Sequence, residues 1–368
     1  MAYTLAIAPR VRKSPFFEAS VAAGATHFTV YNHMYMPVSY GDPEAEYWRL
    51  IRDVALWDVA VERQVEITGP DAAALAQYLS PRDLSRCRVG QGKYVPLCDH
   101  AGRLINDPVL LRLAEDRFWF SIADSDVLLW VRAVAAERGY DLAVREPDVS
   151  PLALQGPKAE ALVCDLFGAW PRGLKYFWFR EAELKGIPLL VARSGWSKQG
   201  GFELYLMDGS RGGELWEMVW AAGQPYGIGP GAPNAVERIE SGLVSYGSDT
   251  DDDTNPFELG LGKYLEPEIE ADFIGKSALR EIARRGAARC RVGLFLEGAP
   301  IETLPHPWAV THDGRPVGRV TAAAYSPRLE RNIALALIAR EAAENGKDLV
   351  VAAPDGPRRA GIANLPFL

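Results

Sequence analysis

Glu203 and Tyr205 combine an acid and an aromatic ring in a pattern that could do chemistry. They lie two positions apart in the apolar run Phe202 to Met207, which has the composition of a strand. Residues two apart on a strand point to the same face, so both side chains are expected to share one cavity. A carboxylate between Phe202 and Leu204 would be costly to bury without hydrogen-bond donors. The pattern favours a binding role for Glu203.

Trp196 precedes this strand in the loop Gly195 to Gly200. An electron-rich ring at that place can stack on a flat ligand or lie against a cation, which is worth about 0.5–2 kcal/mol. The alternative is that Trp196 and Tyr205 are ordinary core aromatics. Composition and spacing leave both interpretations open.

Several other motifs lack residues that their chemistry needs. The acidic run Asp249 to Asp253 has no glycine at the sixth and no glutamate at the twelfth position of a calcium loop, so we expect a solvated acidic loop. The segment Gly227 to Gly231 lacks the spacing of a phosphate loop and is expected to be a turn. No H-E-x-x-H motif occurs, and Ser197 is not in a nucleophile elbow. Hydrolase and metal-site functions are disfavoured.

Composition sets further limits on partners and location. The 368 residues carry a net charge of -8, which disfavours nucleic acids as partners. The apolar stretch Val127 to Ala136 is interrupted by Arg132 and is far shorter than the ~20 residues of a membrane span. Residues 4–8 are apolar and precede Arg10 and Arg12, the reverse of a signal peptide. The four cysteines form no C-x-x-C pair. We expect a cytoplasmic protein that does not associate with a membrane and binds no metal ion.

Alternating strand and helix patterns predict an α+β chain. Asp42 is a plausible N-cap for a helix from Pro43 to Leu56. Two similar strand–helix blocks, the second beginning at Ser150, suggest an internal duplication. After Ala287, short apolar runs broken by Gly and Pro predict a small β-barrel.

The segment Arg193 to Tyr205, which contains Gly-Phe-Glu, is similar to a signature of the T-protein (aminomethyltransferase) family of folate enzymes. The other matching segments are Gly92–Tyr94, Gly102–Asp107, Ala153–Pro157, Glu237–Gly242, Tyr246–Gly247, Asn255–Glu258, Asp272–Lys276 and Ser326–Ile333. Together they span nearly the whole chain, which is more specific than any one of them.

The resemblance implies an α+β T-protein fold with three domains in a clover-like ring and a central folate channel. We expect a discontinuous folate-binding domain (residues 1–55 and 147–262), a second α+β domain (56–146) and a C-terminal β-barrel (280–368). It also implies a tetrahydrofolate-dependent methyltransferase, in which tetrahydrofolate accepts the one-carbon unit. The expected oligomeric state is a monomer or a homodimer.

Site roles carried over from the family are also expectations. Asp107 and Tyr205 are the catalytic candidates, and the alternative for Asp107 is a turn residue before Pro108. The alternative for Arg238 is a surface ion pair with Glu237. The expected folate-binding residues are Tyr94, Asp107, Phe177, Trp196, Glu203 and Arg238. The expected substrate-binding residues are Tyr31, His33, Met34, Trp196 and Tyr205.

Two departures from the glycine-cleavage T-protein pattern concern the substrate. The loop Gly195 to Gly200 reads Gly-Trp-Ser-Lys-Gln-Gly in place of Gly-Tyr-Thr-Gly-Glu-Asp, and Pro108 replaces a second aspartate after Asp107. Both resemble the branch of the family that demethylates dimethylsulfoniopropionate, as do Tyr31–Met34 and Trp57–Ala60 with Glu62–Gln64. The resemblance implies methyl transfer from this sulfonium to tetrahydrofolate. A glycine-cleavage aminomethyltransferase, a folate-dependent N- or O-demethylase and a non-catalytic folate-binding protein remain alternatives.

Overall fold

The computed structural model describes residues 9–302, 306–346 and 348–368. The apolar segment at residues 4–8, whose position before Arg10 and Arg12 is the reverse of a signal peptide, lies outside the described residues. By its internal contacts the chain forms two compact units, each built from separate stretches of sequence. The first comprises Met1–Pro70, Arg88–Lys93 and Val109–Pro233, and the second Asp71–Cys87, Tyr94–Pro108 and Asn234–Leu368. This two-part division does not test the expected three-domain boundaries, which stay a prediction.

The first unit contains a six-stranded sheet. Its neighbouring strands are antiparallel except at one edge, where β15 runs parallel to β3. In order across the sheet the strands are β12 (Phe179–Leu184), β13 (Ile187–Ala192), β14 (Gly201–Leu206), β11 (Ser150–Gln155), β3 (Val54–Asp58) and β15 (Ile228–Gly231). The sheet therefore joins strands from the start, middle and end of this unit's sequence.

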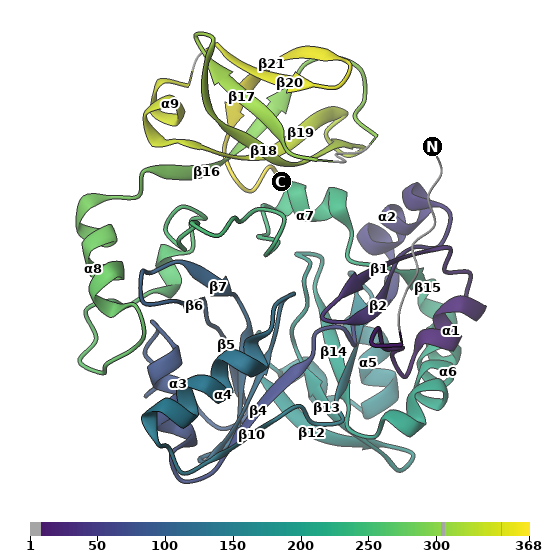
Figure 1. Ribbon diagram of the computed structural model, residues 1–368. Coiled ribbons are helices and arrows are strands. Elements are labelled where there is room, and N and C mark those ends of the chain that lie inside the picture. Colours follow the sequence, from purple (N-terminus) through teal and green to yellow (C-terminus); the bar gives the residue numbers. More distant parts are fainter. Residues whose placement is uncertain (1–8, 303–305, 347) are drawn as a thin grey trace. The chain divides into compact units, whose positions relative to one another are not determined.

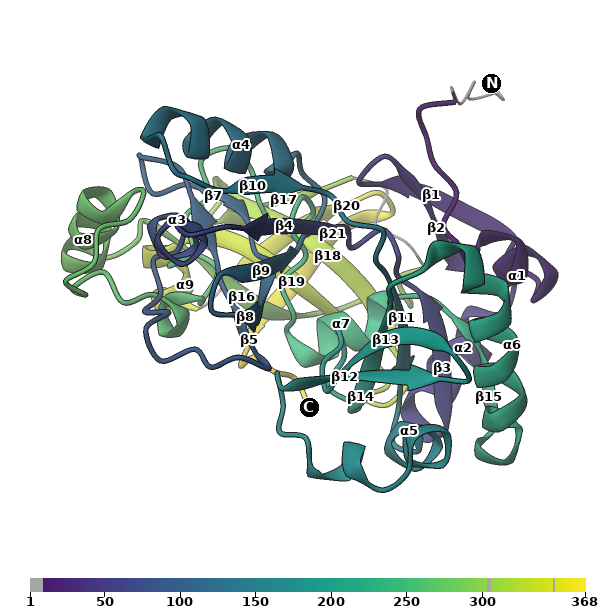
Figure 2. The same cartoon turned by 90° about the horizontal axis from the view of Figure 1, so that it is seen from below.

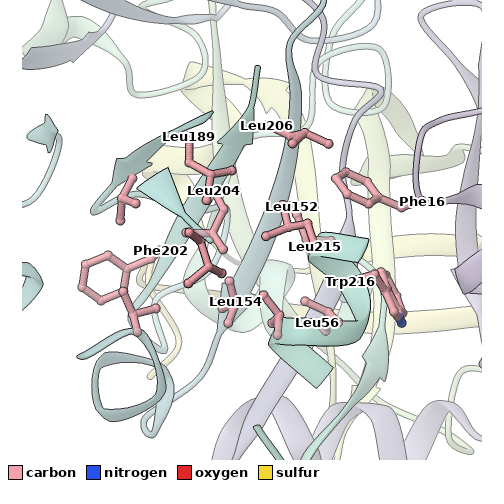
Figure 3. Close-up of a cluster of buried hydrophobic side chains, with 14 of the residues drawn as sticks. Phe16, Leu56, Leu152, Leu154, Leu189, Phe202, Leu204, Leu206, Leu215 and Trp216 are labelled. Atoms are coloured by element: carbon pink, nitrogen blue, oxygen red, sulfur yellow. The ribbon is translucent and has the colours of Figure 1, made fainter. Parts of the chain in front are cut away.

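One face of this sheet packs against helices α5 (Ala159–Phe167) and α6 (Gly212–Gly223) (Figure 2). Figure 3 shows the core between them, with Leu204 of β14 among the buried side chains and Trp216 of α6 beside them. Burying each large apolar side chain contributes about 1.5–3 kcal/mol. Because alternate residues of a strand face opposite ways, Glu203 and Tyr205 point away from this core. They share one face of the strand, as the sequence predicts.

The N-terminal part contributes α1 (Phe17–Ala22), the hairpin of β1 (His27–Tyr31) and β2 (Met34–Ser39), and α2 (Pro43–Arg52). Asp42 caps α2 as expected, accepting a hydrogen bond from the Ala45 N–H at 2.9 Å. The expected continuation of this helix to Leu56 is wrong. Residues 54–58 form the buried strand β3, whose pairing with β11 and β15 outweighs local helix preference.

A second, five-stranded sheet repeats the topology of the first. Its strands in order are β10 (Ala143–Arg145), β4 (Gln64–Thr68), β9 (Arg117–Ser121), β8 (Val109–Ala114) and β5 (Gln91–Tyr94). Read from the other edge, the order β5-β8-β9-β4-β10 matches β12-β13-β14-β11-β15, with β3 inserted before β15. Helix α3 (Ala72–Leu79) follows β4 as α5 follows β11, and α4 (Val127–Arg138) follows β9 as α6 follows β14. The matching order supports the expected duplication.

Residues 228–231 form strand β15 and not the expected turn. This edge strand pairs with β3, and the glycines allow close approach of neighbours: a Cβ on Gly229 would lie 2.2 Å from Arg49 Nε. The proline at position 230 is tolerated because an edge strand has one side without sheet partners. Glycine and proline content alone could not distinguish this strand from a turn.

The second unit ends in a closed six-stranded barrel, drawn in green to yellow in Figure 1. In order around the barrel the strands are β16 (Arg289–Leu296), β19 (Arg331–Ala339), β18 (Arg315–Ser326), β17 (Trp308–His312), β20 (Leu349–Ala353) and β21 (Gly356–Ala363). Its interior holds Leu294, Val310, Val320 and Ile338, all fully buried. The expected C-terminal β-barrel is confirmed.

The rest of the second unit is loop-rich. Besides α3 it contains the short pair β6 (Leu97–Cys98) and β7 (Leu104–Asn106), the helices α7 (Ala235–Ser241) and α8 (Lys276–Arg285), and α9 (Arg340–Asn345) beside the barrel strands. A cluster that includes Cys98, Leu104, Val244, Leu259 and Phe273 forms its core. Long-range apolar contacts thus order segments that have little regular secondary structure.

Across the described ranges, no helix is long and apolar enough to cross a bilayer. Cys87, Cys98, Cys164 and Cys290 are all free thiols. The same residues contain no group of three or more His, Cys, Asp or Glu side chains arranged to hold a metal ion.

Candidate functional site

Glu203 lies on the face of β14 that points away from the helices, with short side chains on either side. Its register partners are Ala153 on β11 and Ala192 on β13. Ala153 in turn pairs with Trp57 on β3, so an indole ring follows in the same row across the sheet. Both register partners are alanines, so no large side chain at these two positions crowds the carboxylate.

Two hydroxyl groups donate to one oxygen of the Glu203 carboxylate. Ser194 Oγ and Tyr205 OH both donate to Oε2, the latter at 3.1 Å. Oε1 accepts no hydrogen bond from the residues that the structure describes, and the protein does not fully enclose this atom. Burial raises the pKa of Glu203, and the two hydroxyl donors only partly offset that effect. The carboxyl group thus keeps an acceptor for a donor that these residues do not supply.

Tyr205 is enclosed, with 1 % of its surface exposed. Its ring lies 6.3 Å from that of Trp119 and packs in a cluster with Leu111, Phe179 and Leu190. Burial, followed by the nearby Glu203 charge, raises the pKa of the phenol well above its usual range, so the hydroxyl stays protonated and donates. The hydroxyl orients Glu203, while the ring belongs to the core.

The loop Arg193–Gly200 is fixed by the buried side chain of Gln155. Gln155 Nε2 donates to the Ser194 carbonyl at 3.2 Å, and Ser197 Oγ donates to Gln155 Oε1 at 2.7 Å. Gly195 has φ +147°, and a Cβ there would lie 2.0 Å from Gln155 Nε2, so only glycine fits. This anchoring places the Ser194 hydroxyl on Glu203 and holds the half-buried Trp196 in a defined loop.

Phe177 adopts a left-handed backbone conformation with φ +62°, which is uncommon for a bulky residue. Its N–H donates to the Arg193 carbonyl at 2.9 Å, and its carbonyl accepts from the Gly92 N–H. Gly92 permits this approach, because a Cβ there would lie 3.3 Å from the Phe177 carbonyl oxygen. Both hydrogen bonds stabilise this strained backbone conformation. They fix the half-buried ring of Phe177, whose centroid lies 4.3 Å from that of the Tyr176 ring.

In the second unit, Tyr94 and Asp107 form a hydrogen-bonded pair. Tyr94 OH donates to Asp107 Oδ2 at 2.7 Å, and the Tyr94 ring meets that of Tyr264 edge-on at 4.9 Å. Burial, assisted by the charge of Asp249, raises the pKa of Asp107 to about 7, although the Tyr94 hydroxyl acts to lower it. A half-buried carboxyl group that titrates near neutrality can accept and release a proton.

Arg238 is a buried ion-pair residue. Its Nη1 donates to Asp249 Oδ2 at 2.7 Å and to the Leu243 carbonyl at 3.2 Å. Asp249 is fully buried, and Thr321 Oγ1 donates to its other oxygen at 2.6 Å. The expectation of a solvated acidic loop is therefore wrong at Asp249, and also at Asp251, which pairs with Arg289. Local charge pattern could not reveal basic partners from distant segments.

Comparison with known proteins identifies the family. Residues 16–268 match the GCVT N-terminal domain, and residues 289–368 match the glycine cleavage T-protein C-terminal barrel domain. The chain belongs to the glycine cleavage T-protein family. It is 44% identical over 350 residues to the dimethylsulfoniopropionate demethylase DmdA of Ruegeria pomeroyi, covering 95% of each chain. It is 32% identical over 347 residues to an aminomethyltransferase of Desulfitobacterium hafniense, covering 93% of each chain.

A solved T-protein structure has the same fold. The glycine cleavage system aminomethyltransferase T from Bartonella henselae matches with a TM-score of 0.87 over 97% of this chain and 98% of that chain, at 24% identity. The expected T-protein fold is confirmed.

The T-protein resemblance also led to Tyr31, His33 and Met34 as substrate-binding candidates, and the structure brings Tyr31 and Met34 together but keeps the His33 side chain apart from them. Tyr31 and Met34 pair across the β1–β2 hairpin, with Met34 buried in the helix-side core. His33 is exposed, and its Nε2 lies 3.1 Å from Asp126 Oδ1. Asn32 between them is also buried, and its side-chain amide donates to the Val61 and Ala123 carbonyls. These contacts give the hairpin a structural anchor, and the substrate role stays a prediction.

The structure adds residues that sequence reasoning missed. Ser194 and Gln155 lie inside the segments that resemble T-proteins, but the sequence suggested no role for either residue. Their contacts depend on the geometry of the loop, which residue spacing does not reveal. Nothing in the sequence except its aromatic side chain distinguished Tyr264, which contacts the Tyr94 ring. Asp249 was recognised only as one of a run of acids. Glu203 and Tyr205, which were predicted to share one face, are in contact. Tyr94 and Asp107, which were predicted separately as folate-binding residues, also contact each other within the second unit.

Proposed function

We propose that this protein is a tetrahydrofolate-dependent dimethylsulfoniopropionate demethylase, which forms methylthiopropionate and 5-methyltetrahydrofolate. The observation that carries the proposal is the 44% identity over 95% of both chains to a dimethylsulfoniopropionate demethylase, against 32% to an aminomethyltransferase. The Gly195–Gly200 loop and Pro108 support the same choice, since both depart from the glycine-cleavage pattern.

The residues of the Glu203 cluster fit a reduced pterin. A pterin presents adjacent N–H groups at one edge, and a carboxylate is the side chain that accepts two such bonds. Glu203 has one oxygen without a donor among the described residues and alanines on both sides. We assign Glu203 to pterin binding, Ser194 and Tyr205 to its orientation, and Trp196 and Phe177 to the walls of the folate site.

Asp107 is the candidate proton acceptor. Tetrahydrofolate, when bound, supplies the N5 amine that takes the methyl group. Displacement at the methyl carbon breaks the carbon–sulfur bond, the electron pair stays on sulfur, and the thioether leaves without needing an acid. We assign Asp107 to accepting the proton that the methylated amine would lose, and the Tyr94 hydroxyl holds its carboxylate in place. With the pKa of Asp107 raised to about 7, its ionised form gains population as pH rises through neutrality.

The rest of the catalysis is alignment and exclusion of water. A sulfonium cation is stabilised by aromatic faces, each worth about 0.5–2 kcal/mol. We assign Trp196 and Tyr31 to this role, with His33 and Met34 as further candidates on the same hairpin. Tyr205 remains a candidate for the same contact, although its enclosed ring favours a role through Glu203. Arg238 is a further folate-binding candidate, and its ion pair with Asp249 holds the guanidinium in place.

A panel of methyl donors tests the proposal. Purified protein is incubated with tetrahydrofolate and, separately, dimethylsulfoniopropionate, N-methyl amines, O-methyl aromatic compounds and a glycine-loaded lipoyl carrier. The proposal expects turnover with the sulfonium. Turnover only with an N- or O-methyl donor indicates a different demethylase of this family, and methylene-tetrahydrofolate made only from the carrier indicates a glycine-cleavage aminomethyltransferase. Folate binding without any turnover indicates a non-catalytic protein.

Cellular location and assembly complete the proposal. We assign the protein to the cytoplasm, where a reducing environment suits four free thiols. A monomer or a homodimer is expected, and light scattering of the purified protein distinguishes the two.

A further inference from the structure

The turn Lys175–Trp178 holds a bulky residue in a strained backbone conformation. The Trp178 N–H donates to the Lys175 carbonyl at 2.9 Å, and Phe177 is the third residue of this β-turn, with φ +62°. A β-turn with positive φ at its third residue usually has glycine there. Tyr176, the second residue of the turn, is 59 % exposed. Strained residues of this kind concentrate at binding sites, so the turn is a candidate for contact with a ligand.

Two consecutive residues connect this turn to Glu203. The Phe177 N–H donates to the Arg193 carbonyl at 2.9 Å, and the next residue, Ser194, donates to the Glu203 carboxylate. Arg193 Nη1 also donates to the carbonyl of residue 174 at 2.9 Å, which ties the segment before the turn to the same loop. The exposed fraction rises along this path, from 6 % at Glu203 to 59 % at Tyr176. Within the first unit, the path leads from an enclosed acid to the protein surface.

Positive charge is in excess around the turn. Arg172 and Lys175 are exposed, and Arg193 is half-buried. Glu160 pairs with two of them, at 2.9 Å from Arg193 and 3.5 Å from Arg172. Lys175 forms no ion pair with the residues that the structure describes. Three cations thus have one carboxylate among them, in a protein whose net charge is -8. Charges more than about 8 Å away are largely screened at physiological salt, so this local excess favours an anionic ligand.

Tetrahydrofolate has a matching order of chemical groups. Its pterin lies at one end, a p-aminobenzoyl ring follows, and one or more glutamates form the other end. A pterin bound to Glu203 leaves the glutamate end to reach the surface. Each further glutamate in a γ-linked tail adds one carboxylate, which exposed cations can pair with in water. The charge and the exposure of the turn therefore fit the tail of this cofactor.

We propose that Arg172 and Lys175 bind the glutamate tail of tetrahydrofolate, so that the protein prefers folates with several glutamates. This inference rests on the proposed function, which supplies the ligand and the position of its pterin. Both side chains lie at the surface, where tails of different length can pair with them without being enclosed. Phe177 and Arg193 hold the turn in place beside the loop that orients Glu203.

Tetrahydrofolates that carry one or four glutamates test the inference by calorimetry. The wild type should bind the tetraglutamate about 3- to 10-fold more tightly than the monoglutamate, the range for two exposed ion pairs, and high salt should reduce this ratio. Lys175→Glu should bring the ratio to about one or below, because the reversed charge repels the tail. Affinity for tetrahydropteroate, which has no glutamate, should stay within about twofold of the wild-type value.

Lys185→Glu is the matched control. Lys185 is an exposed lysine at the other end of β12, whose six residues span about 20 Å, beyond the reach of screened charges. This variant changes the net charge by the same amount and should leave the ratio unchanged. A wild-type ratio near one, or equal reduction by both variants, overturns the inference alone. Absence of binding to any of the folates would remove the proposed function together with it.

Discussion

Each of the two sheets in the first unit buries one glutamate, and the two carboxylates are satisfied in different ways. Glu66 in the five-stranded sheet is 1 % exposed and accepts hydrogen bonds from Trp119 Nε1, Arg117 Nε and Arg145 Nε, at 2.8, 2.7 and 2.6 Å. Glu203 in the six-stranded sheet is 6 % exposed and accepts from two neutral hydroxyls, both on one oxygen. The first acid is neutralised by the fold, and the second is not.

The pKa shifts of the two acids follow from these partners. Burial acts to raise the pKa of Glu66, but hydrogen bonds from Trp119 and the two arginines outweigh burial and lower it. Burial raises the pKa of Glu203, because its hydroxyl donors compensate only partly. A buried acid saturated by the chain serves stability, whereas one with an open oxygen is suited to bind a ligand. The comparison predicts that substitution of Glu66 mainly lowers the stability of the fold, whereas substitution of Glu203 mainly weakens ligand binding.

The largest predicted effect is the loss of stability caused by the substitution Glu66→Ala. The free energy of unfolding should fall by about 2–3 kcal/mol, below the 3–5 kcal/mol for a fully buried ion pair, because water can reach the arginines left behind. Urea denaturation measures this loss. Arg145→Ala is the control and should cost only about 0.5 kcal/mol, since its side chain is 65% exposed. A loss under about 1 kcal/mol for Glu66→Ala would show that this acid does not stabilise the fold.

Glu203→Gln should change binding more than stability. The amide keeps one acceptor but replaces the other with a donor, so tetrahydrofolate should bind about 10- to 30-fold more weakly, equivalent to about 1.4–2 kcal/mol. The free energy of unfolding should change by less than about 1 kcal/mol, because no buried cation loses its partner. Calorimetry and urea denaturation give the two values. An unchanged dissociation constant would remove Glu203 from the folate site.

The pH dependence of stability should have opposite signs at the two acids. The lowered pKa of Glu66 adds stability above the ordinary glutamate pKa, and this is lost as pH falls through the lowered value. The raised pKa of Glu203 means that the folded state holds this proton more tightly, so wild-type stability declines relative to Glu203→Gln as pH rises above the ordinary value. Urea denaturation at several pH values checks both signs. A Glu203→Gln curve parallel to that of the wild type contradicts the shift.

The smallest effect is expected for Ser194→Ala. It removes one hydroxyl donor to Glu203 and should weaken tetrahydrofolate binding by about fivefold, the equivalent of one hydrogen bond of about 1 kcal/mol. Ser197→Ala is a matched control in the same loop, because its hydroxyl donates to Gln155 and does not contact Glu203. Equal losses in both variants would mean that loop order, and not the donor to Glu203, determines binding.

The sequence predicted the features of the site that depend on short-range geometry. The two-residue repeat of a strand put Glu203 and Tyr205 on one face, and the structure confirms their contact. Asp42 was recognised as a helix cap for the same reason, since capping depends on a partner three residues away. The β-barrel was predicted from its short apolar runs.

Features that depend on distant partners could not be predicted. Asp249 resembles its acidic neighbours in sequence, yet Arg238 and Thr321 bury it. Ser194 reaches Glu203 only because Gln155 fixes the intervening loop. The strand Ile228–Gly231 looks like a turn until β3 is seen to pair with it. In each case a tertiary contact overrides the local pattern.

Transfer of a labelled methyl group tests the central claim most directly. Dimethylsulfoniopropionate with ¹³C in its methyl groups is incubated with the protein and tetrahydrofolate, and the products are identified by mass spectrometry and NMR. The account predicts equal amounts of methylthiopropionate and 5-methyltetrahydrofolate labelled at the N5 methyl, and no methyl loss without folate. Folded protein that leaves the sulfonium intact, or that demethylates it without labelling folate, would contradict the account.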